Sequence, residues 1–210
     1  MHSLNDMIAS GKVLYIGVSD TPAWIVSKAN QYARDHGLRQ FSVYQGKWNA
    51  ATRDFERDII PMARDEGMGL LPWAALGGGF FKTEEQRKAS EGRGKKDVPE
   101  PVIAVCKVLE KIAKEKDTLI TSVALAYVMQ KTPYVFPIVG GRKIEHLKGN
   151  IEALNLELTK EEIDEIEGAT PFDLGFPLNM ITTGPDSWLN KFGGHNKFVE
   201  ESKVMFPFHH

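Results

Sequence analysis

The sequence predicts an α/β fold, and within that class a partial (β/α)8 barrel with about four of the eight strand–helix units. Four short apolar runs, at residues 13–18, 41–44, 68–72 and 134–139, each end in polar, glycine or aromatic residues. Stretches with the apolar spacing of amphipathic helices separate these runs. Strands that are apolar along their length and carry reactive groups only at their carboxyl ends are typical of parallel sheets. Because the polar ends are spread over all four strands, a half barrel is favoured over a small open doubly wound sheet.

The predicted barrel is incomplete. The chain has 210 residues, whereas a full barrel takes about 250, and it opens in a helical pattern that no strand precedes. We therefore expect one incomplete domain over 1–210, with the last four barrel strands and their helices in 1–170 and an irregular tail in 171–210. The strands at 13–18 and 134–139 would be open edges of the barrel. Such edges favour self-association, because unpaired strand edges readily accept another strand.

Composition excludes several classes of partner. The formal net charge is −2 and the isoelectric point is about 6.3, so no nucleic acid or anionic membrane is expected as a partner. Cys106 is the only cysteine, which rules out an intrachain disulfide and favours a reducing compartment. Its apolar neighbours predict a place in the core. No apolar run approaches the ~20 residues of a membrane span, and residues 1–10 lack the apolar centre of a signal peptide. A cytoplasmic protein is expected.

The first third of the chain is expected to form a helix, a strand and a second helix. Leu4 and Ile8, four residues apart, predict a helix over the first nine residues. The run at 13–18 follows as the first strand. Pro22 then predicts the start of the second helix, because proline suits the first helical position. The apolar face of this helix is expected to hold Ile25, Ala29, Tyr32 and Ala33.

The centre of the chain alternates in the same way. The second strand is expected at 41–45, a helix at 53–66 with a kink at Pro61, and the third strand at 68–73. Residues 83–101 are dominated by Lys, Arg, Glu, Ser and Gly. They are expected to form a solvated surface loop, with a lid over a bound ligand as the functional alternative.

Three helices, the fourth strand and a capped final helix complete the predicted elements. The helices are expected at 102–116, 122–131 and 144–153, and the strand at 134–139. Thr159 and Glu162 fit a capping box, in which each side chain satisfies a backbone amide at the start of the last helix.

Two glycine-rich segments follow predicted strands. Gly77–Gly79 can let backbone amides approach a phosphate, because glycine has no side chain in the way; a flexible loop is the simpler explanation. Gly140–Lys143 is the stronger signal, since two glycines free the amides, two cations follow, and a helix N-terminus beyond them favours an anion. Arg142 can add a forked contact to a phosphate. A solvated basic turn is the alternative for this segment.

Polar and aromatic side chains end the other strands. Ser19 and Asp20 can cap the following helix or bind a ligand, and Gln45 can bond to a carboxamide or to backbone. Trp73, taken alone, is expected in the core. The histidines show no metal-ligand spacing, and no Ser/His/Asp or Cys/His arrangement suits a nucleophile.

Taken together, these segments resemble the aldo-keto reductases, and within that family the fungal aryl-alcohol dehydrogenase and norsolorinic acid reductase group. The matching stretches are Gly11–Trp24, Tyr44–Asn49, Arg53–Arg64, Gly140–Asn150 and Pro171–Pro177. The resemblance covers nearly all of the first 180 residues or so.

The resemblance implies a TIM barrel that uses NADP(H) to interconvert an aldehyde or ketone and its alcohol. It implies that Ser19, Asp20 and Gln45 hold the nicotinamide carboxamide and that Trp73 stacks on the ring. The loop at 74–82 would line the pyrophosphate. Gly140–Lys143, together with His146 and Asn150, would hold the adenosine and its 2′-phosphate. The expected cofactor-binding residues are Ser19, Asp20, Gln45, Trp73, Ala74, Ala75, Leu76, Gly77, Gly78, Gly79, Phe80, Gly140, Gly141, Arg142, Lys143, His146 and Asn150.

The chain departs from the family pattern at three places. Gly149 stands where many relatives have a glutamate that contacts adenine, and His146 stands where arginine or glutamine is common. Asp20 stands where many relatives have asparagine.

The catalytic Asp, Tyr, Lys and His of the family lie on its first four strands, so we expect the chain to begin after them and assign it no catalytic residue. The expected function is an NADP-dependent oxidoreductase with a small aromatic or polyketide-like carbonyl or alcohol as substrate. The alternative is a non-catalytic, truncated or regulatory cofactor-binding module.

Overall fold

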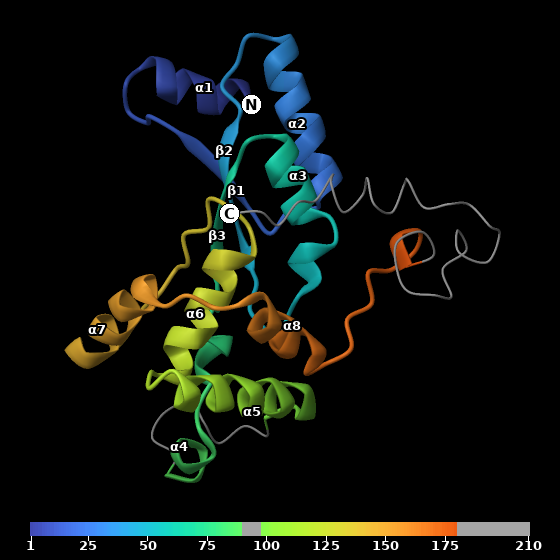
Figure 1. Cartoon of the computed structure of the whole chain (residues 1–210). Helices are drawn as coiled ribbons and strands as arrows, with labels where there is room; N and C mark the ends of the chain where they lie inside the picture. The colour runs from blue at the N-terminus through green and yellow to red at the C-terminus, as the bar shows by residue number, and fades with distance from the viewer. Residues whose placement is uncertain (90–97, 180–210) are drawn as a thin grey trace, which may run out of the picture. The chain divides into compact units, whose positions relative to one another are not determined.

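The computed structural model describes residues 1–89 and 98–179. The chain divides into two compact units, Met1–Thr170 and Pro171–His210, and every strand and named helix lies in the first (Figure 1). In the described part of the chain, no helix has the length and apolar character needed to cross a membrane. The predicted irregular tail therefore falls in the second unit, of which residues 171–179 are described.

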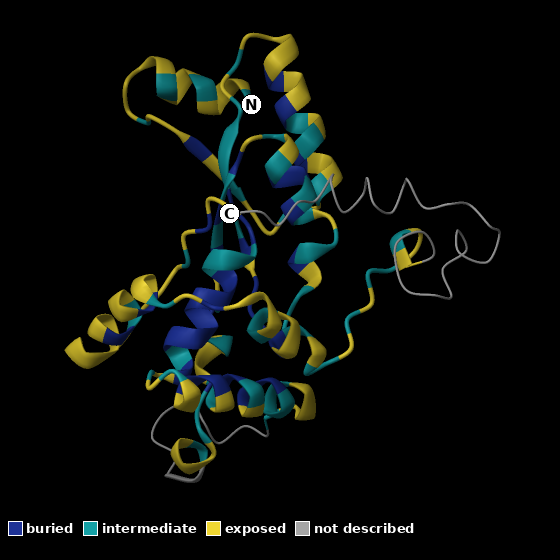
Figure 2. Ribbon diagram, in the orientation of Figure 1, coloured by how far each residue is buried: buried dark blue, intermediate teal, exposed yellow. Residues whose placement is uncertain are grey.

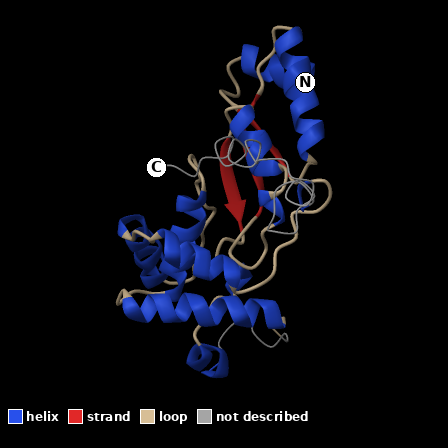
Figure 3. Ribbon diagram, turned by 45° about the vertical axis from the view of Figure 1, so that its right-hand side comes forward, coloured by secondary structure: helices blue, strands red, loops and turns tan. Residues whose placement is uncertain are grey.

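Three parallel strands form the sheet of the first unit. They are β1 (Ile16–Ser19), β2 (Phe41–Lys47) and β3 (Gly69–Trp73), in the order β1-β2-β3. Figure 3 shows the three as one sheet. The register places Ser19 beside Gln45, and Lys47 beside Trp73. The predicted parallel α/β arrangement is thus confirmed, with β1 beginning later and β2 ending later than expected.

The predicted fourth strand is wrong as a strand, although its position is right. Residues 134–139 form one parallel bridge, between Val135 and Leu70. Leu70 N donates to Tyr134 O at 2.9 Å, and Phe136 N donates to Leu70 O at 2.8 Å. The segment therefore lies beside β3 and runs parallel to it. Ile138 N continues the pairing by donating to Pro72 O at 2.8 Å. Two local features limit the ladder: Tyr134 has φ 61°, and Pro72 of β3 has no N–H to donate to this segment.

Helices join and cover the strands. They are α1 (His2–Ala9), α2 (Ala23–Asp35), η1 (Asp54–Glu56), α3 (Ile59–Asp65), η2 (Gly77–Gly79), α4 (Glu84–Ala89), α5 (Glu100–Glu115), α6 (Ile120–Lys131), α7 (Ile144–Glu152), η3 (Ala153–Asn155) and α8 (Lys160–Gly168). The capping box of α8 is confirmed, since Thr159 N donates to Glu162 Oε2 at 2.7 Å and Glu162 N to Thr159 Oγ1 at 3.3 Å.

The polar stretch at 83–101 holds α4 rather than loop alone. Residues 90–97, in the middle of the predicted lid, lie outside the described part of the chain.

The sheet buries one face only. Along β2 and β3 burial alternates, so that Tyr44 and Leu70 are buried while Val43 and Leu71 on the other face are only partly covered. The buried face packs in one core with α2 and α3, which lie along the same side of the sheet (Figure 1). Parallel sheets are usually buried on both faces. In the described residues, no helix covers the second face.

The second helix, α2, differs from the prediction in its first residue and in the side chains that it buries. Pro22 is its N-cap, and no side chain caps the helix. Its buried residues are Val26, Asn30 and Ala33, whereas Ile25 and Tyr32 are exposed. Asn30 explains the rotation, because its Oδ1 accepts a hydrogen bond from Phe41 N at 2.9 Å. This buried amide ties α2 to the start of β2, so the buried stripe follows Asn30.

The predicted kinked helix at 53–66 is two short helices. η1 ends at Glu56 and α3 begins at Ile59. Pro61 is the third residue of α3, where backbone N–H groups have no intrahelical partner. It therefore breaks no hydrogen bond and causes no kink.

A buried charged network joins η1 to α6 and α8. Arg53 Nη2 lies 2.7 Å from Glu56 Oε2 and 3.1 Å from Glu167 Oε2. Tyr127 Oη lies 3.2 Å from Glu56 Oε1 and 3.3 Å from Glu167 Oε1, and Lys131 pairs with Glu167. Burial lowers the pKa of Arg53, but its hydrogen bond to Glu56 and the nearby carboxylates outweigh that effect and raise it. Burial and the same carboxylates raise the pKa of Tyr127.

Candidate functional site

Three predicted site residues meet at the carboxyl end of the sheet. Trp73 Nε1 donates to Asp20 Oδ1 at 3.2 Å, and Ser19 Oγ donates to Asp20 Oδ2 at 2.9 Å. Asp20 N donates to Gln45 O at 3.0 Å, so Gln45 adjoins the same loop. All three side chains of the network are exposed. Trp73 is therefore a rim residue and not the core residue that its type alone predicted.

Tyr44, a core residue that was not predicted as part of the site, holds the loop after β1 in place. Tyr44 Oη donates to Thr21 O at 2.7 Å and accepts from Thr21 N at 3.0 Å. Burial raises the pKa of Tyr44, so the phenol stays protonated and keeps both hydrogen bonds. Asp20 has φ 48°, a left-handed conformation that aspartate tolerates. Asp20 and Thr21 are thus positioned by the core and do not cap α2.

The loop after β3 turns through four left-handed residues. Ala74, Gly77, Gly78 and Gly79 have φ of 56°, 63°, 63° and 90°. A Cβ added at Gly77 would lie 2.8 Å from the Phe81 ring, whereas nothing lies within 4 Å of one at Gly78 or Gly79. The backbone at the last two glycines is therefore open to a ligand. Glycine is needed at all three positions, since left-handed φ is costly for other residues.

Buried side chains hold this loop on both sides. Asn49, which is buried, donates from Nδ2 to Ala74 O at 3.0 Å. Ala75 lies in the core, and Cys106 Sγ donates to Phe80 O at 3.5 Å. Cys106 is fully buried in the core, as predicted, and this burial raises the pKa of its thiol. Asn49 was not predicted to position this loop, because the sequence around a polar residue does not show which distant backbone group it will bind.

The second glycine-rich segment leads into α7 as predicted. Lys143 is the N-cap of α7, and its side chain makes no capping hydrogen bond. A Cβ at Gly141 would lie 2.6 Å from His146 Cβ, so this glycine lets the segment fold tightly onto the helix. Arg142 and Lys143 are exposed. Two cations therefore stand beside free amides at a helix N-terminus, where an anion is favoured.

A cavity of about 750 Å3 brings the two glycine-rich segments together. Leu76 and Gly79 line it from the loop after β3, and Gly140, His146 and Asn150 line it from the start of α7. The other predicted residues lie outside its lining: the strand-end group (Ser19, Asp20, Gln45, Trp73), the remaining loop residues (Ala74, Ala75, Gly77, Gly78, Phe80) and the basic turn (Gly141, Arg142, Lys143).

The cavity also has lining residues that sequence reasoning missed. Lys82, Glu110 and Lys114 contribute charge, and Glu110 Oε1 pairs with Lys114 Nζ at 2.9 Å. The hydrogen bond from Lys114 lowers the pKa of Glu110. These residues lie on a loop and on α5, and no motif in the sequence marked them.

Gly149, at the family position of a glutamate, sits tightly at the cavity wall. A Cβ there would lie 2.8 Å from Leu119 Cδ1, and Ser122 Oγ donates to Gly149 O at 3.2 Å. α7 therefore lies close against α6 at this position.

The described residues hold no group of three or more His, Cys, Asp or Glu side chains suited to a metal ion. The site therefore combines a parallel sheet with polar strand ends, a cavity lined by part of the glycine loop and by the start of α7, and a basic turn before that helix. Such an arrangement is typical of α/β proteins that bind a ligand at the carboxyl ends of parallel strands.

The chain belongs to the Aldo/keto reductase family, whose sequence profile matches residues 1–170. Norsolorinic acid reductase B of Dothistroma septosporum is 59% identical over 226 residues, covering 99% of this chain and 57% of that protein. Norsolorinic acid reductase A of Aspergillus parasiticus is 56% identical over 185 residues, covering 88% and 47%. An aryl-alcohol dehydrogenase of Pestalotiopsis microspora is 50% identical over 218 residues, covering 99% and 56%. The predicted resemblance to this fungal group is confirmed.

The fold comparison agrees with the family. A crystal structure of a thermostable aldo-keto reductase in complex with the inhibitor epalrestat matches with a TM-score of 0.59 and 22% identity. The match covers 80% of this chain and 53% of that one. The chain thus spans about half the length of the curated relatives and of the solved structure that it matches.

Proposed function

We propose that this chain is the cofactor-binding portion of an NADP-dependent aldo-keto reductase. Its substrate would be a small aromatic or polyketide-like aldehyde or ketone, or the corresponding alcohol. The observation that carries the proposal is the cavity of about 750 Å3 shared by the glycine loop after β3 and the start of α7. The names of the relatives, norsolorinic acid reductase and aryl-alcohol dehydrogenase, support the substrate class.

We also propose that residues 1–170 are the last four strand–helix units of a (β/α)8 barrel, within one incomplete domain that ends in the tail 171–210. Support comes from the order of four adjacent parallel segments, β1, β2, β3 and 134–139. The single cysteine supports a cytoplasmic location, because a buried thiol without a partner suits a reducing compartment.

The geometry fits the adenosine end of a dinucleotide. The cavity volume lies within the roughly 300–1,000 Å3 of small-molecule sites. Gly78 and Gly79 leave their backbone uncovered, as a pyrophosphate cradle needs, because only bare amides can approach the oxygens closely. Arg142 and Lys143 lie between Gly140 and Glu145, which line the cavity, and would supply positive charge for a 2′-phosphate.

The geometry also fits the nicotinamide end. Ser19 and Asp20 present a hydroxyl and carboxylate beside Gln45, and these polar groups can hold a carboxamide. The indole of Trp73 is tethered to Asp20, which fixes its plane where a nicotinamide ring can stack on it. When bound, the cofactor supplies the hydride for the carbonyl carbon. The residues of this chain bind and orient that cofactor, and we assign none of them to proton donation.

A comparison of cofactor binding with turnover tests this function. We expect the purified chain to bind NADPH, measured by the change in its fluorescence, and to reduce an aromatic aldehyde such as veratraldehyde weakly or not at all. Robust turnover by the monomer would contradict the assignment of proton donation to residues outside the chain. Loss of binding as well as turnover would contradict the cofactor site itself.

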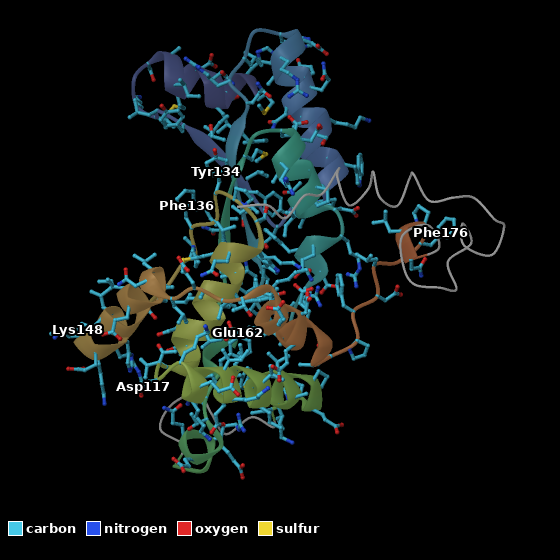
Figure 4. The ribbon with its side chains drawn as sticks, viewed as in Figure 1. Asp117, Tyr134, Phe136, Lys148, Glu162 and Phe176 are labelled. Atoms are coloured by element: carbon cyan, nitrogen blue, oxygen red, sulfur yellow. The ribbon has the colours of Figure 1, made fainter. Side chains whose placement is uncertain are left out.

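Arg142→Ala is expected to weaken NADPH binding about tenfold and NADH binding less than twofold. A charge-assisted hydrogen bond contributes about 1.5–3 kcal/mol, and only NADPH carries the 2′-phosphate. Isothermal titration with both cofactors measures the two affinities. Lys148→Ala, which removes an exposed cation from α7, the helix that follows Arg142 (Figure 4), is the matched control and should change neither. Equal losses for NADPH and NADH in Arg142→Ala would reject the 2′-phosphate role.

A further inference from the structure

Away from its polar carboxyl end, the exposed face of the sheet is apolar, and it has no partner among the described residues. Val43, Leu71 and Phe136 project from this face, and Gly69 lies between two of them: a Cβ there would meet Val43 at 3.5 Å and Phe136 at 3.6 Å. In Figure 4, Tyr134 and Phe136 lie on the opposite side of the sheet from α2 and α3. An exposed apolar surface of this kind marks an interaction site.

Both edges of the sheet continue this surface. The residues at 13–19 on one edge and at 134–139 on the other carry no charge. Six large apolar side chains on these edges are between 40% and 78% exposed: Leu14, Tyr15, Tyr134, Phe136, Ile138 and Val139. Natural proteins usually protect an edge strand with charges or a covering element. Here Pro137 alone interrupts the row of backbone donors on one edge.

Helix α7 carries a second apolar stripe next to the same edge. Its exposed side chains recur every three or four residues and are between 53% and 70% exposed: Ile144, Leu147, Ile151 and, just beyond the helix, Leu154. Figure 2 shows α7 as mostly exposed, in contrast to the buried α6. A helix that follows a parallel strand crosses over in the right-handed sense and lies above the next strand of the sheet. The strand that α7 would cover is therefore the one that would pair with 134–139.

We propose that a second copy of this chain covers this surface, in a two-fold dimer whose axis runs along the strands. A rotation about that axis keeps all strands parallel and places the β1 edge of each copy beside the 134–139 edge of the other. The two sets of four parallel segments then form eight, the number at which a barrel closes with its interior filled by side chains. The stripe on α7 lies over the β1 of the partner.

The exposed area supports a stable dimer. The ten apolar residues on the edges and on α7 expose roughly 100 Å2 each, on the scale of 150–250 Å2 for a fully buried aromatic side chain. Their total of roughly 1,000 Å2 exceeds the ~800 Å2 per partner of a standard protein–protein interface. The two edges are uncharged, so no like charges oppose their pairing. This inference does not depend on the proposed cofactor.

Sedimentation of the full chain measures the predicted assembly. We expect a species of twice the chain mass of 23.5 kDa, with an affinity that is not reduced by salt, because the contact is apolar. Leu147→Glu places a carboxylate in the α7 stripe and should weaken the dimer at least tenfold. Lys148→Glu places one at an exposed charged position of the same helix and should leave the dimer intact.

Disulfide trapping tests the symmetry. Within one copy the two edges are three strand spacings apart, about 14 Å, which is too far for an intrachain disulfide. The double variants Tyr15→Cys/Tyr134→Cys and Tyr15→Cys/Val139→Cys sample two registers across the seam. After oxidation, at least one should give a covalent dimer on a non-reducing gel, while each single variant stays monomeric.

Three outcomes would overturn the proposal. A monomer at all concentrations would mean that the surface is covered within the chain or remains open. Larger polydisperse species would mean unspecific edge pairing. Efficient cross-linking by a single-cysteine variant would mean that like edges meet, and the two-fold axis along the strands would be wrong.

Discussion

Glu56→Ala is expected to lower the free energy of unfolding by about 3–5 kcal/mol, the cost of removing one partner from a buried ion pair. Glu56 Oε1 accepts from Trp48 Nε1 at 3.1 Å and from Arg53 Nε at 3.0 Å. The side chains of Arg53 and Glu56 are only 10% and 9% exposed. The variant removes both Glu56 hydrogen bonds from the Arg53 guanidinium, and leaves the indole N–H of Trp48 without this acceptor.

Urea denaturation followed by circular dichroism measures this loss. Asp54→Ala is the matched control, because Asp54 lies in the same short helix and pairs with Arg57 while its side chain is 70% exposed. Exposed ion pairs contribute about 0–1 kcal/mol, so the control should lose no more than that. Glu56→Gln keeps an acceptor oxygen and should fall between the two. If Glu56→Ala and Asp54→Ala lose equal stability, the buried network does not hold η1 to α6 and α8.

Trp73→Ala is expected to weaken NADPH binding by tenfold or more. Stacked aromatic pairs contribute about 0.5–1.5 kcal/mol beyond the area that they bury, and each 1.4 kcal/mol is a factor of ten in affinity. The variant also frees the Asp20 carboxylate from its hydrogen bond with the indole. Both effects act at the proposed nicotinamide position, and neither changes the cavity at α7.

Fluorescence titration with NADPH measures this effect. Trp24→Ala is the control, because Trp24 is an exposed tryptophan on α2 whose ring neighbour is Lys28, 5.7 Å from its centroid. This control should bind NADPH as the unmodified chain does. Trp73→Phe retains a ring and should recover part of the affinity. If Trp73→Ala and Trp24→Ala bind NADPH equally well, Trp73 does not stack on the cofactor.

The two glycine-rich segments illustrate how far a sequence can locate a site. Each follows a run of apolar residues. Gly77–Gly79 was correctly predicted to follow a strand, whereas Gly140–Lys143 follows a segment that lies parallel to β3 without being a strand. Their meeting around one cavity was not visible in the sequence, because about 60 residues separate Gly79 from Gly140. Before the structure, only the resemblance to a known family predicted that the two segments bind the same ligand.

Three differences from the predicted elements have local physical causes. The buried stripe of α2 follows Asn30, whose side chain bonds to the backbone of β2. Pro61 falls in the first turn of α3, where it is tolerated. The segment at 134–139 keeps only one bridge, since Tyr134 is left-handed and Pro72 of β3 has no N–H to donate to it. Periodicity cannot detect any of these, because each depends on a partner or on a turn position.

The sequence by itself determined the parallel α/β class, the order of the strands and the ends at which polar groups collect. These depend on residue type at fixed local spacing, which the chain carries in one dimension. The tertiary structure alone decided that Trp73 lies on the rim bound to Asp20, that Tyr44 and Asn49 hold the loops, and that one face of the sheet is open. Such outcomes depend on contacts between distant residues, whose free energy of burial and hydrogen bonding exists only after the chain has folded.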